Sequence, residues 1–116
     1  MNFQDDTGMT PLHYAAWKGL SEIANLLIDN GANVDCVENL SNATPLHLAC
    51  KTGHLETGII ILQQNPKLAF DGYGDSPLHV AALKNHDKII EVLVQEYGYD
   101  VEIVSIAYLL RNVYLI

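Results

Sequence analysis

The sequence has few basic residues and little cysteine. Lysine and arginine supply only 6 of 116 residues against 14 acidic ones, which gives a net charge of −8. Because nucleic-acid binding needs clustered Lys and Arg, this balance argues against unspecific binding to DNA or RNA. Two cysteines are too few for a disulfide framework in a chain of this size, which favours a reducing compartment.

Motifs for common catalytic and metal sites are also missing from the sequence. It has no Cys-x-x-Cys, no His-Glu-x-x-His and no glycine-rich loop with the lysine that would cradle a phosphate. No serine or threonine stands at a recognisable spacing from a paired base. We therefore expect no enzymatic activity, cofactor, metal or small-molecule substrate. Residues 2–6 are polar and acidic, unlike a signal peptide, so we expect a cytoplasmic location, with the nucleus as an alternative.

The sequence does contain one heptapeptide in three copies. Residues 10–16, 44–50 and 76–82 read TPLHYAA, TPLHLAC and SPLHVAA. The copies start 34 and 32 residues apart (44 − 10 and 76 − 44). A nearly constant step of this size indicates one supersecondary unit built three times, with each unit burying its apolar face against the next.

Each heptapeptide is typical of a helix start. Thr or Ser can accept a hydrogen bond from a first-turn amide, and proline suits the first helical position, where an N–H would stay unpaired. Gly or Asn follows nine residues after each Thr or Ser, and these residues tolerate the left-handed conformation that ends a helix. A second apolar segment then predicts helices over 21–30, 55–65 and 87–97.

Turn-rich segments separate the units and predict short β-hairpin fingers. They cover residues 31–43 and 66–75, and residues 5–8 open the chain in the same way. Each finger has a Gly or Asn two residues before the helix cap, where we expect a positive φ. The uneven steps between heptapeptides also fall in these segments, where a change of loop length costs little.

With these features in register, the chain resembles an ankyrin-repeat protein, a family with a period of about 33 residues and the motif T-P-L-H-x-A. The resemblance covers residues 5–102, in repeats at approximately 5–38, 39–70 and 71–102. It implies an all-α solenoid of helix–turn–helix units with β-hairpin fingers. It also implies a scaffold or adaptor that binds a protein partner, and we expect a monomer. The alternative is a targeting or regulatory arm of a larger enzyme, channel or signalling protein.

Two stretches depart from the repeat pattern. Thr57-Gly58 replaces a branched apolar pair in the second helix of the middle unit, and glycine inside a helix costs about 1 kcal/mol, so this helix is predicted to be the weakest. Residues 103–116 are apolar but contain no further heptapeptide. Arg111 interrupts them and they are too short for a membrane span, so we expect no membrane association. They are either a degenerate cap helix packed on the third unit or a truncated continuation.

The histidines of the heptapeptides, His13, His47 and His79, occur once per unit. Neighbouring helices pack about 10 Å apart, whereas a metal–nitrogen bond is about 2 Å long, so we do not expect the three to share a metal ion. We expect each ring to form a hydrogen-bonded bridge to the neighbouring finger. His54 and His86 lie at the starts of second helices and are interpreted as hydrogen-bonding groups at helix ends.

In the ankyrin family, finger tips and exposed positions of the first helices commonly contact partners. Trp17, the only tryptophan, is at such a position. It is either a binding hot spot or a cover for a neighbouring finger or a missing N-terminal repeat.

Lys18, Lys51 and Lys84 fall near the ends of first helices, where they either compensate the helix dipole or form a basic stripe. Such a stripe, with Trp17 and Tyr73 beside it, would suit an acidic, partly aromatic segment. Carried over residue by residue, the predicted partner-binding positions are Asp6, Thr7, Met9, Trp17, Lys18, Leu40, Ser41, Ala43, Lys51, Thr52, Gly72, Tyr73, Asp75, Leu83 and Lys84.

Overall fold

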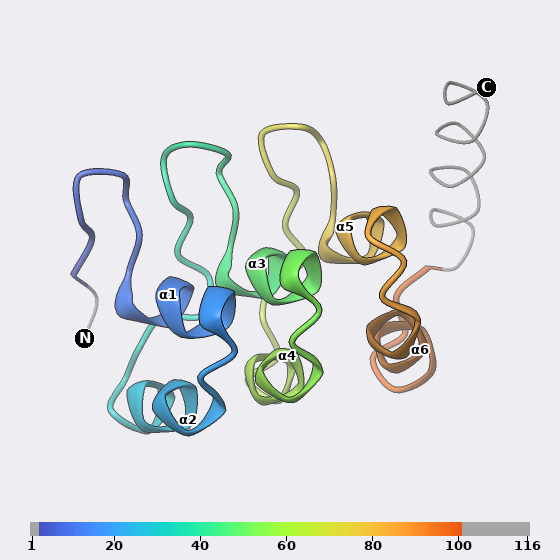
Figure 1. Ribbon diagram of the computed structural model, residues 1–116, viewed down its shortest axis with the longest axis horizontal. Coiled ribbons are helices and arrows are strands. Elements are labelled where there is room, and N and C mark those ends of the chain that lie inside the picture. The colour runs from blue at the N-terminus through green and yellow to red at the C-terminus, as the bar shows by residue number, and fades with distance from the viewer. Residues whose placement is uncertain (1–2, 101–116) are drawn as a thin grey trace.

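Three pairs of short helices stack side by side in a single row (Figure 1). A computed structural model describes residues 3–100 of the chain. The first helices pack against one another in sequence order, the second helices do the same, and the fingers project from the row of first helices. This arrangement confirms the predicted all-α solenoid. The pairs are α1 (Pro11–Lys18) with α2 (Ser21–Asp29), α3 (Pro45–Thr52) with α4 (Leu55–Leu62), and α5 (Pro77–Leu83) with α6 (Asp87–Gln95).

Each first helix begins with a reciprocal pair of hydrogen bonds. In the first unit the Thr10 hydroxyl accepts from the His13 backbone N–H at 3.2 Å, and Nδ1 of His13 accepts from the Thr10 N–H at 3.1 Å. The same capping box forms at the starts of α3 and α5. Proline occupies the first turn in all three helices. The predicted helix starts are therefore confirmed, and the histidine takes the role that Glu or Gln usually has in this motif.

The second helices end earlier than predicted. They stop at Asp29, Leu62 and Gln95 rather than at 30, 65 and 97. After Leu62 the chain tightens, because the N–H groups of Gln64 and Asn65 bond to carbonyls only three residues back, both at 3.0 Å. Asn65 then takes a positive φ of 50°. In the sequence, Gly and Asn therefore mark the left-handed residue beyond the helix rather than its last turn.

The core lies between the two rows of helices. The leucine of each heptapeptide, Leu12, Leu46 and Leu78, is 1% exposed. The small pairs that follow, at 15–16, 49–50 and 81–82, are also buried, as expected for helices that approach closely. Each unit thus contributes the same residues to the apolar interior, which forms two clusters that Ile28 and Val34 both contact, as predicted for a stack of repeats.

The fingers are loops rather than β-hairpins. No strand is assigned within residues 3–100, and only one or two backbone hydrogen bonds close each tip. They run from Asp5 to Met9 and Gly8 to Asp5 in the first tip, from Glu38 to Ala43 in the second, and from Asp71 to Asp75 and Gly74 to Asp71 in the third, at 2.9–3.0 Å. These bonds do not continue into a hairpin ladder, and other tip amides donate between fingers. The Asn39 N–H bonds to the Thr7 carbonyl and the Gly72 N–H bonds to the Ser41 carbonyl, both at 2.7 Å, which joins neighbouring fingers. The expected positive φ is confirmed at Gly8 (83°), Asn42 (53°) and Gly74 (81°).

One extra residue lengthens the second finger tip. Six positions separate Glu38 from its helix cap at Thr44 (44 − 38), against five from Asp5 to Thr10 (10 − 5) and from Asp71 to Ser76 (76 − 71). The step between these tip acids is nevertheless 33 both times (38 − 5 and 71 − 38). The segment from Asn65 to Asp71 is one residue shorter than the corresponding segment from Gly31 to Glu38, which offsets the longer tip. The predicted placement of the length changes in the fingers is confirmed, and both lie beside Glu38 or Asp71.

Two parts of the sequence interpretation remain predictions. Thr57 and Gly58 both lie inside α4 and are buried, but the low stability expected of this helix stays untested. The two interpretations of residues 103–116 lie outside the described residues, as does the end of the third repeat at 102.

Candidate partner-binding groove

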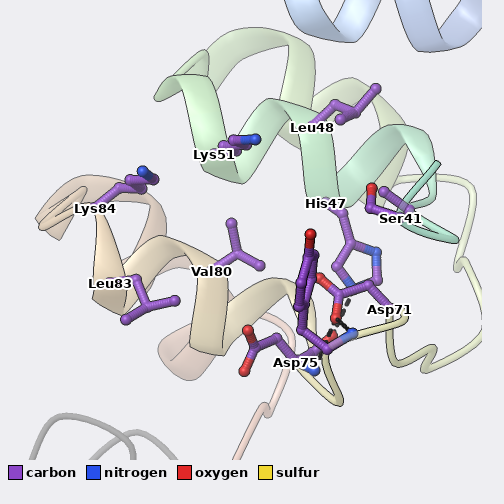
Figure 2. Close-up of a pocket in the computed structure, with 11 residues that line it drawn as sticks. Ser41, His47, Leu48, Lys51, Asp71, Asp75, Val80, Leu83 and Lys84 are labelled. Atoms are coloured by element: carbon purple, nitrogen blue, oxygen red, sulfur yellow. Dashed lines mark hydrogen bonds between the residues drawn. The ribbon is translucent and has the colours of Figure 1, made fainter. Parts of the chain in front are cut away.

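A groove runs between the finger tips and the first helices. It consists of two adjoining hollows: one of about 420 Å³ between the first two units and one of about 530 Å³ between the last two. The hollows share Ser41, Leu48, Lys51 and Tyr73, so they form one continuous surface. Figure 2 shows Lys51 projecting from α3 and Lys84 from the end of α5, on the helix side of the second hollow, with Asp71 on its finger side.

The structure brings together most of the positions predicted to bind a partner. Their role in binding stays a prediction, but their common location on one surface is now established. The predicted residues that line the two hollows are Thr7, Met9, Trp17, Leu40, Ser41, Ala43, Lys51, Tyr73, Asp75, Leu83 and Lys84. The predicted residues that do not line them are Asp6, Lys18, Thr52 and Gly72. The groove therefore contains two of the three lysines of the expected stripe.

Sequence reasoning missed part of the groove floor. Tyr14, Leu48 and Val80 line the hollows, and all three occupy the variable position after the histidine of the heptapeptide. The change of residue at this position from repeat to repeat was the signal that could have identified it as part of the groove. Leu48 and Val80 are nevertheless 6% and 7% exposed, which is why an apolar residue at this position is interpreted as core.

Trp17 and Lys51 meet across the first two units. The ammonium nitrogen of Lys51 lies 5.5 Å from the centre of the Trp17 ring, a cation–π contact that contributes about 0.5–1 kcal/mol at exposed sites. Trp17 itself is 40% exposed, while Leu40 and Tyr73 on the neighbouring finger tips are each 80% exposed. The first hollow is thus lined by large apolar side chains that the fold does not bury.

The carboxylates of the groove are held by the fingers. Glu38 is buried and accepts hydrogen bonds from the Leu40 N–H at 2.8 Å, the Ala43 N–H at 3.0 Å and both the N–H and hydroxyl of Ser41. Burial alone would raise the pKa of Glu38, but these hydrogen bonds outweigh it and hold the pKa below its ordinary value. Asp71 likewise accepts from two amides of its own tip. By contrast, the lysines of the groove are exposed.

The heptapeptide histidines connect the units as predicted. His13 bonds through Nε2 to the Ala43 carbonyl at 3.0 Å, and His47 does so to the Asp75 carbonyl at 2.8 Å. Because Nδ1 accepts the cap amide, Nε2 carries the proton and the rings are neutral. Burial lowers the pKa of both His13 and His47. The bridging role is confirmed for these two, whereas the finger that would follow His79 is not among the described residues.

The histidines before the second helices contact the preceding unit. Nε2 of His86 lies 3.1 Å from the Lys51 carbonyl at the end of α3, which confirms the expected role. Neither His54 nor His86 caps its own second helix through its side chain, so the prediction is confirmed only for His86, at the end of the preceding first helix. Instead the His54 ring lies against Gly19 and the His86 ring against Gly53, so closely that a Cβ on either glycine would clash with it. Here glycine is required both for its positive φ and for space.

Other reactive groups offer no second site within residues 3–100. No group of three or more His, Cys, Asp and Glu side chains is placed there to hold a metal ion. Cys50 is completely buried, and burial raises the pKa of its thiol, which makes the thiol unreactive. None of the described helices has the length and apolar character needed to cross a membrane.

Stacked helical pairs with a groove along the fingers define a repeat solenoid that offers an extended binding surface. Comparison with protein families agrees with this class: a model described as "Ankyrin repeats (3 copies)" matches residues 33–105, and one described as "Ankyrin repeat" matches residues 7–39. The chain belongs to the ankyrin-repeat family. Domains of this family are non-catalytic modules that mediate protein–protein interaction.

The similar curated proteins are much longer than this chain. It is 37% identical over 89 residues to the mouse "Protein fem-1 homolog A-like", which covers 77% of this chain and 14% of the mouse protein. It is 36% identical over 90 residues to "E3 ubiquitin-protein ligase XBAT33" of Arabidopsis thaliana, covering 76% and 17%. It is 32% identical over 97 residues to the human "Transient receptor potential cation channel subfamily A member 1", covering 80% and 9%. The chain thus spans less than a fifth of each of these relatives.

Proposed function

We propose that this chain is a scaffold or adaptor module that binds a protein partner in the groove between its fingers and first helices. The observation that carries this proposal is the exposure of Trp17, Leu40 and Tyr73 together on that surface. Large aromatic side chains dominate the energy of protein interfaces. The fold does not need these three for its core, since they remain 40–80% exposed.

The fingers support this function because they are already fixed before a partner arrives. Backbone bonds join neighbouring tips, and Asp5, Glu38 and Asp71 each accept hydrogen bonds from the amides of their own tip. A pre-organised surface loses less conformational freedom on binding, which raises affinity. We also propose an acidic partner segment, because Lys51 and Lys84 are exposed in the groove, whereas two of its three carboxylates, those of Glu38 and Asp71, accept hydrogen bonds from their own finger tips.

Proximity labelling in cells tests groove binding. The intact chain, fused to a labelling enzyme, is compared with the double variant Trp17→Ala/Lys51→Glu and with Leu26→Ala. Leu26 is 63% exposed on α2 and lines neither hollow. We expect the strongest labelled proteins to be lost in the groove variant and kept in Leu26→Ala, with similar melting temperatures for all three chains. An unchanged set of labelled proteins in the groove variant would refute the proposal.

A second candidate is that the chain acts as a targeting or regulatory arm of a larger protein. The observation in its favour is that the chain spans 17% of a ubiquitin-protein ligase and 9% of a cation channel to which it is similar. An antibody against the repeats would detect the endogenous protein by size. A product much heavier than the 12.8 kDa chain, from a transcript that continues past Ile116, would support this function. A single product of the size of the chain itself would exclude it.

A further inference from the structure

Three apolar side chains from three different units meet at the first hollow. Trp17 comes from α1, Leu40 from the second finger tip and Tyr73 from the third. Leu48, Met9 and Tyr14 also line the same hollow. At about 420 Å³ the space is of the size at which pockets begin to enclose bulky organic groups. One large apolar side chain of a partner therefore fits here.

The extra residue of the second tip builds one wall of this hollow. Glu38 accepts a hydrogen bond from the Leu40 N–H at 2.8 Å, which holds the lengthened tip in place while the Leu40 side chain stays 80% exposed. The third tip is fixed beside it, because the Gly72 N–H bonds to the Ser41 carbonyl at 2.7 Å. A Cβ on Gly72 would lie only 3.2 Å from that oxygen. Leu40 and Tyr73 are therefore held on adjacent, hydrogen-bonded tips.

Lys51 stands where the apolar hollow meets the second one. Its ammonium group lies over Trp17 in the first hollow, and the residue also lines the second hollow with Lys84. On the finger side, the buried carboxylate of Glu38 accepts bonds from its own tip. The charged residue that both hollows share is therefore Lys51, whose ammonium group complements a carboxylate, while Asp71 and Asp75 line the second hollow from the finger side.

We propose that the groove recognises a peptide segment with two adjacent determinants: a bulky apolar or aromatic side chain seated between Trp17, Leu40 and Tyr73, and a neighbouring Asp or Glu that pairs with Lys51 and Lys84. This inference rests on the proposed function and specifies the chemistry of the partner. It makes Leu40 a specificity-determining residue, because the extra residue of the second tip has no counterpart in the other two.

Selection from a phage-displayed random peptide library tests the inference. The intact chain is the bait, and the selected peptides are then measured against Trp17→Ala, Leu40→Ala and Lys51→Met/Lys84→Met, with Leu26→Ala as the control. We expect peptides that combine an aromatic or large aliphatic residue with a nearby acid. Trp17→Ala should weaken their binding by about 30-fold, the size of an interface hot spot. The double lysine variant should weaken it by about tenfold and reduce its dependence on salt.

A sharper variant removes the extra residue itself. Deletion of Leu40 together with Glu38→Asp gives the second tip the length and the acid of the other two. It should abolish the preference for a bulky apolar residue. If melting shows that the deletion variant does not fold, Leu40→Ala takes its place and should weaken that preference.

The outcomes separate this inference from the function on which it rests. Selected peptides that lack an acid, or that bind the double lysine variant equally well, would overturn the inference while leaving groove binding intact if Trp17→Ala still weakens them. Peptides that bind every groove variant as tightly as the unmodified chain would overturn both. Selected peptides that carry an apolar residue next to an acid support both, if their binding is weakened by Trp17→Ala and by the double lysine variant and is unchanged in Leu26→Ala.

Discussion

In the middle finger and in its two neighbours, an acidic side chain accepts hydrogen bonds from amides of its own tip, but the tips differ in length. Asp5 and Asp71 each accept hydrogen bonds from amides two and four residues ahead. In the middle finger Glu38 does the same for amides two, three and five residues ahead. The tip is one residue longer and the side chain is one methylene longer. The longer side chain of Glu38 thus still bonds to the amides of the longer tip, and the inserted residue does not change the spacing of the neighbouring units.

The second helix of the middle repeat differs from its neighbours as well. At the position where α2 has Ile23 and α6 has Ile89, α4 has Thr57, which is completely buried. Its hydroxyl lies 2.8 Å from that of Ser21 in the preceding repeat, so the polar group is satisfied across the interface. The comparison teaches that an inter-repeat position accepts either an apolar side chain or a paired polar one.

The largest effect is expected from Glu38→Ala. This change leaves amides of the middle tip without their acceptor, and we expect it to lower the free energy of unfolding by about 3 kcal/mol. Asp71→Ala removes fewer bonds from a more exposed tip and should cost about 1 kcal/mol. Urea denaturation of the two variants measures the difference. Equal losses would mean that the longer tip does not depend on its acid.

A smaller effect is expected from His47→Gln. The flexible glutamine amide replaces a rigid ring that accepts the Thr44 N–H and donates to the Asp75 carbonyl, and the weakening of these two bonds should cost about 1 kcal/mol at neutral pH. The variant should also change the pH dependence. Because burial holds the pKa of His13 and His47 below 6.5, the unfolded chain binds more protons below that pH, and stability falls as the pH drops through 6.5.

Urea titrations at a series of pH values measure this slope. It should be shallower in His47→Gln than in the unmodified chain. The pKa values of Glu38 and Asp5 lie below their ordinary values, that of Asp5 at about 2 through its bonds with Tyr14 and Thr7. The contributions of these two carboxylates to stability are therefore lost only in the acidic range of carboxyl titration, well below pH 6.5. A slope that the variant leaves unchanged would assign the pH dependence to other groups.

A gain is expected from Gly58→Ala. Gly58 has no positive φ, and a Cβ there would meet only the Cβ of Ala49, at the ordinary contact distance of 3.8 Å. The change should therefore stabilise the chain by about 1 kcal/mol through helix propensity. Gly53→Ala is the matched control and should destabilise, because its φ is 79° and the His86 ring fills the space. Thermal melting distinguishes the two, and a lower melting temperature in Gly58→Ala would show that α4 is not limited by its glycine.

The smallest effect concerns the hydroxyl pair between α2 and α4. Thr57→Val should cost about 0.5 kcal/mol because Ser21 loses its partner at the interface. Adding Ser21→Ala should cost less than the sum of the two single changes, since both members of the pair are then gone. A double-mutant cycle from urea denaturation measures this coupling. Strict additivity would show that the pair contributes nothing across the repeats.

The fold was largely predictable because its signals are local. Capping residues, proline and left-handed positions act within a few residues of one another, so the first helices and the turns came directly from the heptapeptides. The β-hairpin expectation was wrong because turn residues encode the reversal of the chain but not the hydrogen-bond ladder of a hairpin, and no strand is assigned in any of the three fingers. The second helices were overextended because Asn65 marks the turn rather than the helix.

The site was predictable only where position within the repeat decides exposure. Trp17, Lys51 and Tyr73 came onto one surface as expected from register alone. The contact between Trp17 and Lys51 depends on the spacing of two units and could not be derived from one sequence. The role of Glu38 was missed because it stands one position out of step with Asp5 and Asp71 when the helix caps are aligned.

The acid at each finger tip has a consequence for how such a surface diversifies. The Glu38 side chain is long enough to bond to the amides of a tip with one added residue. The tip can therefore be longer without displacing α3, and the heptapeptide at 44–50 keeps its capping box. An inherited insertion can therefore alter what the surface recognises while leaving the stack unchanged. For a designer, an Asp-to-Glu exchange paired with one inserted residue is a minimal unit for extending a single finger.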